Sequence, residues 1–238
     1  MDDAHAADAS SQPLAGRRVV IAAHGTDLGA DLRKGLERQG ARVALLDALL
    51  DSQSDAQDAF ATGAHLLGGV DLVVHASAMA SATVSAELDN LAEAEWRHAT
   101  QRSLLGTIFC LQSARRHMRA SGGAIVVVGP SVALVGAPGL VPLVTLAEAQ
   151  RTLVKSAARQ WSAQGLRLNW IGVSGPLFSQ TLRDARFPSV PELGPPPPAL
   201  GRVPAIDAEV ADVIGWLACA SGVTGATLNL DGGDWMVP

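Results

Sequence analysis

Short apolar runs alternate along this chain with longer segments in which apolar positions recur every three or four residues. The runs contain few polar positions, which is typical of strands buried on both faces of a sheet. The longer segments show the period of amphipathic helices. The pattern predicts strands at residues 18–23, 41–46, 70–76, 124–128, 166–173 and 227–230, and helices in the stretch ending at Gln39 and at residues 55–67, 91–120, 143–164 and 208–220.

This order of elements predicts an α/β fold with a single Rossmann-type doubly wound parallel sheet of about seven strands and helices on both faces. Residues 1–15, rich in Ala, Asp and Ser, predict a disordered tail, and residues 16–238 predict one domain. Residues 174–204 include the four prolines Pro195–Pro198 and predict an irregular, lid-like loop over the ligand crevice. A surface loop without a ligand role is the alternative.

Composition narrows the possible function classes. The chain has 238 residues, 48% of them hydrophobic, and a net charge of −5 without a basic stripe, which argues against nucleic acid as a partner. Its longest apolar run, residues 132–147, is interrupted by Gly and Pro, so we expect no membrane span. The two cysteines, Cys110 and Cys219, lack metal-ligand spacing and indicate buried, reduced thiols in a cytoplasmic protein without a metal site.

Three stretches resemble one enzyme family. They are the run from Trp96 to Val128, the pair Leu153–Ala158 and Leu166–Pro176, and the C-terminal run VTGATLNLDGG from Val223 to Gly233. Together they make residues 17–233 similar to the short-chain dehydrogenase/reductase family, with its fourth and fifth helices and its C-terminal strand. The resemblance implies the doubly wound fold, but function depends on the residues at the site.

In that family a Tyr transfers a proton to or from the substrate oxygen, a Lys four residues later lowers the pKa of the Tyr, a Ser binds the substrate oxygen, and an Asn holds a relay water. The resemblance places the Tyr position at Leu143, the Lys position at Ala147, the Ser position at Pro130 and the Asn position at Ser103. Of these four residues, only Ser103 has a polar side chain, and the chain contains no Tyr anywhere. We therefore expect no catalytic residues at these positions.

The nucleotide site also departs from the family pattern Thr-Gly-x-x-x-Gly-x-Gly. Ala23 stands at the first glycine and Asp27 at the second, and only Gly29 is retained. The carboxylate of Asp27 would repel a diphosphate, or else cap the helix that follows. Asp47 stands where an acidic residue holds the adenosine ribose, and His75 begins the stretch that reads Asn-Asn-Ala-Gly in the family. These positions form a vestigial site, and we expect this chain to bind no cofactor.

The resemblance also implies a truncation. The connection from Asp47 to Asp71 has room for one helix, whereas the family has a helix, a strand and a second helix there. The sheet should therefore be shortened around its second and third strands.

Two hypotheses about function remain. Some members of this family pair an active subunit with an inactive one, including a dehydrogenase of a benzylsuccinyl-CoA-type intermediate. The resemblance therefore favours a non-catalytic subunit that stabilises an active dehydrogenase partner, such as a hydroxyacyl-CoA-type enzyme, in a heterodimer or heterotetramer with NAD on the partner. The alternative is a dehydratase, cyclase or isomerase that acts without nicotinamide. It would hold His75 in an open pocket, in contact with a Ser or Glu.

Overall fold

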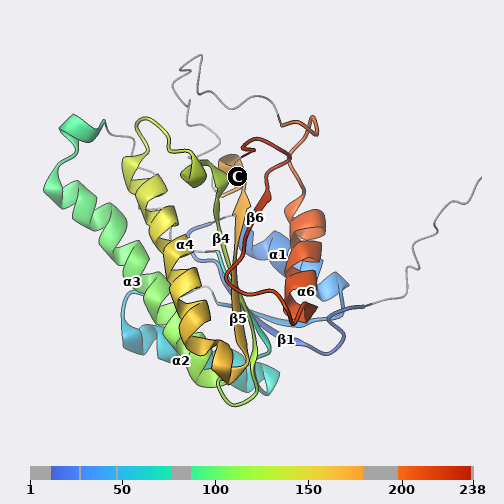
Figure 1. Ribbon diagram of the computed structural model, residues 1–238. Coiled ribbons are helices and arrows are strands. Elements are labelled where there is room, and N and C mark those ends of the chain that lie inside the picture. Colours follow the sequence, from blue (N-terminus) through green and yellow to red (C-terminus); the bar gives the residue numbers. More distant parts are fainter. Residues whose placement is uncertain (1–11, 27, 47, 77–86, 179–197, 237–238) are drawn as a thin grey trace, which may run out of the picture.

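A sheet of six parallel strands forms the centre of the molecule (Figure 1). The computed structural model describes residues 12–26, 28–46, 48–76, 87–178 and 198–236. The strand order is β2-β1-β3-β4-β5-β6. The bounds are β1 (Arg18–Ala22), β2 (Arg42–Leu46), β3 (Leu72–His75), β4 (Gly123–Pro130), β5 (Leu166–Val173) and β6 (Thr227–Leu230).

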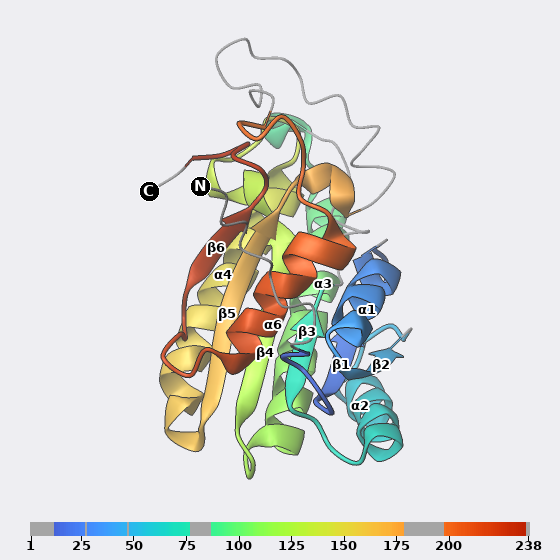
Figure 2. The same cartoon turned by 90° about the vertical axis from the view of Figure 1, so that its right-hand side faces the viewer.

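Helices cover both faces of the sheet (Figures 1 and 2). One face carries α1 (Leu28–Arg38) and α6 (Ala211–Cys219), which continues the π-helical turn η6 (Ile206–Val210). The other face carries α2 (Gln53–Leu67), α3 (Glu93–Met118) and α4 (Val141–Trp161). Short 3-10 segments lie in the connections: η2 (Leu88–Asn90), η3 (Ser131–Leu134), η4 (Ser162–Gln164) and η5 (Gly175–Leu177).

The core has two halves, one on each side of the sheet. In β1, Val19 and Ile21 pack into the cluster on the α1 side, whereas Val20 packs with Phe60 of α2 on the other side. Successive strand residues point to opposite faces, so a strand covered on both sides needs apolar residues at every position. This is why the apolar runs of the sequence predicted the strands.

The predicted fold class is confirmed, with one correction. The sheet has six strands rather than about seven, because α2 alone leads from β2 to β3. The expected truncation therefore lies where the sequence placed it, and it leaves β2 at the edge of the sheet.

Several expectations concern segments outside the core. Most of the predicted tail, and residues 179–197 of the predicted lid-like loop, lie outside the described residues. The tail prediction is wrong at its end, because Leu14 is fully buried and its N–H donates to the carbonyl of Gln39.

Cys110 is buried as expected, but Cys219 is exposed. None of the helices in the described ranges is both long and apolar enough to cross a membrane.

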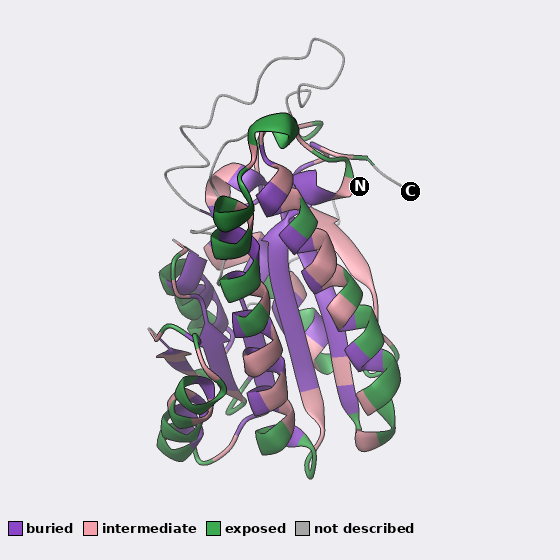
Figure 3. Cartoon of the chain, turned by 90° about the vertical axis from the view of Figure 1, so that its left-hand side faces the viewer, coloured by how far each residue is buried: buried purple, intermediate pink, exposed green. Residues whose placement is uncertain are grey.

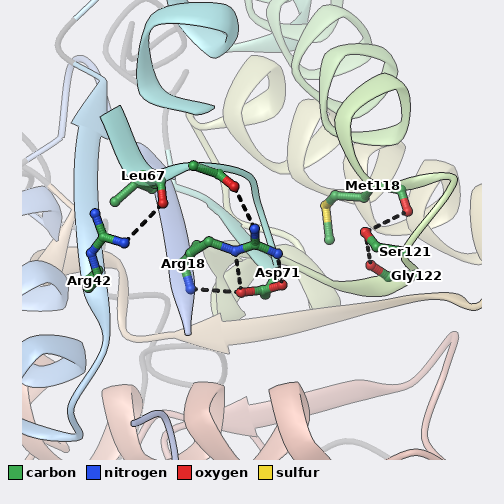
Figure 4. Close-up of polar contacts among 8 residues, drawn as sticks. Arg18, Arg42, Leu67, Asp71, Met118, Ser121 and Gly122 are labelled. Atoms are coloured by element: carbon green, nitrogen blue, oxygen red, sulfur yellow. Dashed lines mark hydrogen bonds and ion pairs between the residues drawn. The ribbon is translucent and has the colours of Figure 1, made fainter. Parts of the chain in front are cut away.

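An ion pair joins the amino ends of β1 and β3 (Figure 4). The guanidinium of Arg18 donates from Nε and Nη2 to the carboxylate of Asp71, at 2.8 and 2.6 Å, and from Nη1 to the carbonyl of Gly68. The backbone N–H of Arg18 also donates to Asp71. The hydrogen bonds from Arg18, above all those from its side chain, lower the pKa of Asp71. Burial acts in the opposite direction but is the weaker effect. The pair fixes the pairing of the two strands whose other ends form the crevice.

Candidate functional site

The ligand crevice of a doubly wound sheet lies at the carboxyl ends of the strands where the strand order reverses. Here the chain passes from β1 to β2 on one side, and then from β2 across β1 to β3 on the other side. The crevice therefore lies beyond Ala22 and His75, the last residues of β1 and β3. The amino end of α1 follows directly after β1. Backbone N–H groups at a helix amino end favour anionic ligands.

A tight turn connects β1 to α1. The N–H and the hydroxyl of Thr26 both donate to the carbonyl of Ala23, at 3.2 and 3.0 Å, and Gly25 has a φ of +79°. Gly29 is buried, and a Cβ there would lie 3.1 Å from the Cβ of Ala23 and 3.2 Å from Leu45. Gly29 therefore allows α1 to pack closely on the strands, which is one of the glycine roles in such turns. Asp27 and Asp47 lie outside the described residues.

The residues that the resemblance places at the family's catalytic positions are buried. Pro130 ends β4 and pairs with Val173 of β5. Leu143 and Ala147 lie in the first two turns of α4, and both are fully buried in the same apolar cluster as Val173. Ser103 of α3 is 5% exposed, and its carbonyl accepts a hydrogen bond from the hydroxyl of Thr107.

A buried polar network lies one helical turn further along α3 and α4 from these positions. The hydroxyl oxygen of Thr107 lies 3.0 Å from Nε2 of His75 and accepts a hydrogen bond of 2.7 Å from the amide of Gln150. All three side chains are almost wholly buried, and burial lowers the pKa of His75 to about 4. His75 is therefore a neutral imidazole at pH 7 that connects β3 to α3, and Gln150 connects α4 to the same point.

The second hypothesis predicted His75 in an open pocket, in contact with a Ser or Glu. In the described part of the chain His75 is 1% exposed, and one of its contacts is with a threonine. Of the other polar groups near the crevice, Glu148 forms an ion pair with Arg151.

Sequence reasoning missed Thr107 and Gln150. Thr107 follows Ser103 by four residues and Gln150 follows Ala147 by three, so each lies on the same helix face as its family position. That spacing was the only available signal, and it did not show that the two side chains meet.

Sequence reasoning also missed a set of polar side chains at the carboxyl ends of β5 and β6. The hydroxyl of Ser174 donates to the carboxylate of Asp234 at 3.0 Å, and Asp231 accepts from the N–H of Gly233. Burial raises the pKa of Asp234, the Ser174 hydrogen bond opposes that rise, and the nearby charge of Asp231 adds to it. The described residues contain no group of three or more His, Cys, Asp or Glu side chains placed to hold a metal ion.

Comparison with known proteins decides the family. The model of the family described as enoyl-(acyl carrier protein) reductase matches residues 6–234. The chain belongs to the short-chain dehydrogenase/reductase family. This is a family of oxidoreductases, and the parallel sheet with helices on both faces is the fold of its members.

Relatives support the same assignment, and a solved structure shares the fold. A γ-butyrolactone 1'-reductase of A-factor type (1S-forming) from Streptomyces virginiae is 30% identical over 227 residues, covering 92% of this chain and 86% of the relative. A 3-oxoacyl-(acyl-carrier-protein) reductase of Staphylococcus aureus is 28% identical over 176 residues, covering 71% and 68%. The structure of a dehydrogenase/reductase from Sinorhizobium meliloti 1021 superposes with a TM-score of 0.80 at 23% identity, covering 96% and 98% of the two chains.

This membership corrects one expectation. We expected no cofactor on this chain and NAD only on a partner, but homologues in the short-chain dehydrogenase/reductase family bind NAD(P) in the same chain. The described part of the nucleotide turn fits such a ligand, because the turn at Gly25, the packing at Gly29 and the amino end of α1 are all in place. A nicotinamide cofactor held there would supply hydride transfer. The substitution at Ala23 does not disrupt the turn, because the Ala23 carbonyl closes it.

Proposed function

We propose that this chain is a non-catalytic subunit of the short-chain dehydrogenase/reductase family, which assembles with a catalytically active member and stabilises it. The observation that supports this is the set of residues at the catalytic positions. Pro130, Leu143 and Ala147 have side chains that neither donate nor accept a proton, and all three are buried. The proposal concerns only the proton donor, and it is compatible with a cofactor bound at the nucleotide turn.

The buried network does not replace the lost proton donor. A general acid must reach the reacting atom within hydrogen-bond distance. His75 is enclosed beneath the crevice and is already hydrogen-bonded to Thr107. The network therefore supports a structural role at this point.

Assembly would use the surfaces that the resemblance implies, which are the outer sides of α3 and α4 together with β6 and α6. Figure 3 shows α3 and α4 side by side, with buried residues toward the sheet and exposed residues outward. Leu105 on α3 is 36% exposed and Trp216 on α6 is 52% exposed. Large apolar side chains at these places are suited to a protein interface.

The first test is mild purification from the native host, with identification of co-eluting proteins. We expect a second short-chain dehydrogenase/reductase that carries both the Tyr and the Lys. Leu105→Asp and Trp216→Asp should release it, whereas Leu66→Asp, at a 68% exposed position on α2, should not. A homo-oligomer without such a partner would contradict the proposal.

The second test is activity. The purified chain should show no hydride transfer between NADH or NADPH and a ketone panel, even where the cofactor binds, while the reconstituted complex should turn over. Turnover by the isolated chain would overturn the proposal, because no partner could then be supplying the proton donor.

A further inference from the structure

A depression lies on the molecule away from the crevice, beside the second half of α4. Its volume is about 420 Å³, and it is lined by Lys155, Ala158, Arg159, Ser162, Thr224 and Gly225. Thr224 and Gly225 precede β6, and the N–H of Gly225 donates to the carbonyl of Leu168 near the start of β5. The depression is therefore near the amino ends of the strands, at the opposite edge of the sheet from the nucleotide turn.

Two positively charged side chains line this depression. Lys155 and Arg159 are both exposed and lie four residues apart, so they occupy the same face of α4. Neither forms an ion pair within the part of the chain that the structure describes, and no Asp or Glu lines the depression. Like charges at this spacing repel each other, and a bound anion would relieve that repulsion.

The hydroxyl groups add one more donor. Thr224 accepts a hydrogen bond of 3.1 Å from the N–H of Leu168, which leaves its own proton for another acceptor. Ser162 donates to the carbonyl of Ala158 at 2.6 Å, so its proton is already used. The depression thus presents an ammonium, a guanidinium and a hydroxyl donor, which is the chemistry of an oxyanion site.

We propose that this depression binds the phosphate group of a small phosphorylated ligand. Two cations balance a phosphate monoester, which carries a charge of about −1.5 to −2 at pH 7. The volume falls within the roughly 300–1,000 Å³ of small-molecule sites and exceeds that needed by phosphate alone. The carbon part of the ligand would lie against Ala158 and Gly225. The site is separate from the crevice, but it borders α4 and β6, which the proposed function assigns to assembly. Phosphate binding is therefore tested on the chain without a partner.

Calorimetric titration of the full chain with inorganic phosphate and with glycerol phosphate, at constant ionic strength in chloride, tests this. We expect saturable binding of both, with the ester tighter. Lys155→Gln and Arg159→Gln should each weaken binding at least about tenfold, since each removes a charge-assisted hydrogen bond. Glutamine keeps high helix propensity, so both variants should melt like the unmodified chain.

Arg116→Gln is the matched control, because Arg116 is also an exposed helical cation and lies outside the depression. It should bind phosphate as the unmodified chain does. An equal loss of phosphate affinity in the control would overturn the proposal, because binding would then depend only on the overall positive charge of the surface. Absence of saturable binding, or weaker binding of the ester than of inorganic phosphate, would overturn it as well.

Discussion

Nε2 of His75 lies 3.0 Å from the hydroxyl oxygen of Thr107, in a site that solvent does not reach. The Thr107 hydroxyl has one proton, and that proton points to the carbonyl of Ser103 at 3.1 Å. With its proton on the Ser103 carbonyl, Thr107 accepts from Gln150 and can accept from His75 as the Nε2–H tautomer. The contact joins the central strand β3 to α3, one helical turn from Ser103.

His75 should make stability depend on pH. Burial lowers its pKa to about 4, whereas the unfolded chain titrates near about 6.5. Acid therefore protonates the unfolded state first, so the stability that His75 contributes is complete above about pH 6.5 and is lost progressively toward pH 4. Between about pH 7.5 and about pH 5 the free energy of unfolding should fall by about 2 kcal/mol from this residue.

Urea denaturation at the two pH values measures this effect, with His75→Asn as the reference. The variant keeps a polar side chain but does not titrate in this range. An equal pH dependence in the two proteins would show that His75 does not cause it.

Thr107 should be the least replaceable member of the network. Thr107→Val keeps the shape of the side chain but leaves the donors of His75 and Gln150 buried without an acceptor, at a cost of about 2–4 kcal/mol. Thr107→Ser keeps the hydroxyl and should lose about 1 kcal/mol, for its missing methyl group. Chemical denaturation at neutral pH compares the two, and a Val variant as stable as the Ser variant would contradict the network.

Restoring the family's residues should fail for reasons of space. Leu143 and Ala147 are fully buried in the core. Leu143→Tyr should cost about 1–3 kcal/mol by overpacking, while Leu143→Met, of similar volume, should cost less than about 1.5 kcal/mol. Thermal or urea unfolding distinguishes them. A neutral Tyr substitution would mean that position 143 opens to the crevice, and would weaken the proposed function.

The ion pair of Arg18 and Asp71 should contribute more than the exposed ion pairs do. Asp71→Asn should cost about 1–3 kcal/mol near pH 7, because three donors of Arg18 lose a charged acceptor. Glu37→Gln removes only the exposed pair with Arg33 and should cost about 0.5 kcal/mol or less. The pKa of Asp71 is lowered in the folded state, so its contribution is present above about pH 4 and is lost below it. Unfolding curves at about pH 7 and about pH 3 should therefore show the Asn variant converging on the unmodified chain in acid.

Much of the fold was predictable because its signal is local. Strands such as β1 and β5 are covered on both faces, so they leave continuous apolar runs in the sequence. The missing strand was also predictable, because the length of the connection between β2 and β3 limits it to one helix. The predicted number of strands, about seven, was too high. It was taken from the family pattern and not from the length of that connection.

The site was predictable only in part. Counting residues along the chain is enough to assign Pro130, Leu143 and Ala147 to positions of the family pattern, because that pattern is defined by spacing in the sequence. Counting does not show which polar groups share a buried space, and so it missed the contact of Gln150 with Thr107, 43 residues apart. The cofactor expectation was wrong because it weighed the substitutions at Ala23 and Asp27 without the turn that Gly25 and Thr26 retain.

By itself, the sequence determined the order of strands and helices, the truncation of the sheet and the absence of any tyrosine, because each of these depends on composition, period or length. The tertiary structure decided which of those residues meet. It brought His75, Thr107 and Gln150 together from β3, α3 and α4, and it covered Leu143 with the core. Burial and hydrogen-bond partners depend on contacts between elements far apart in the chain, so only the folded molecule shows that His75 is buried and meets Thr107.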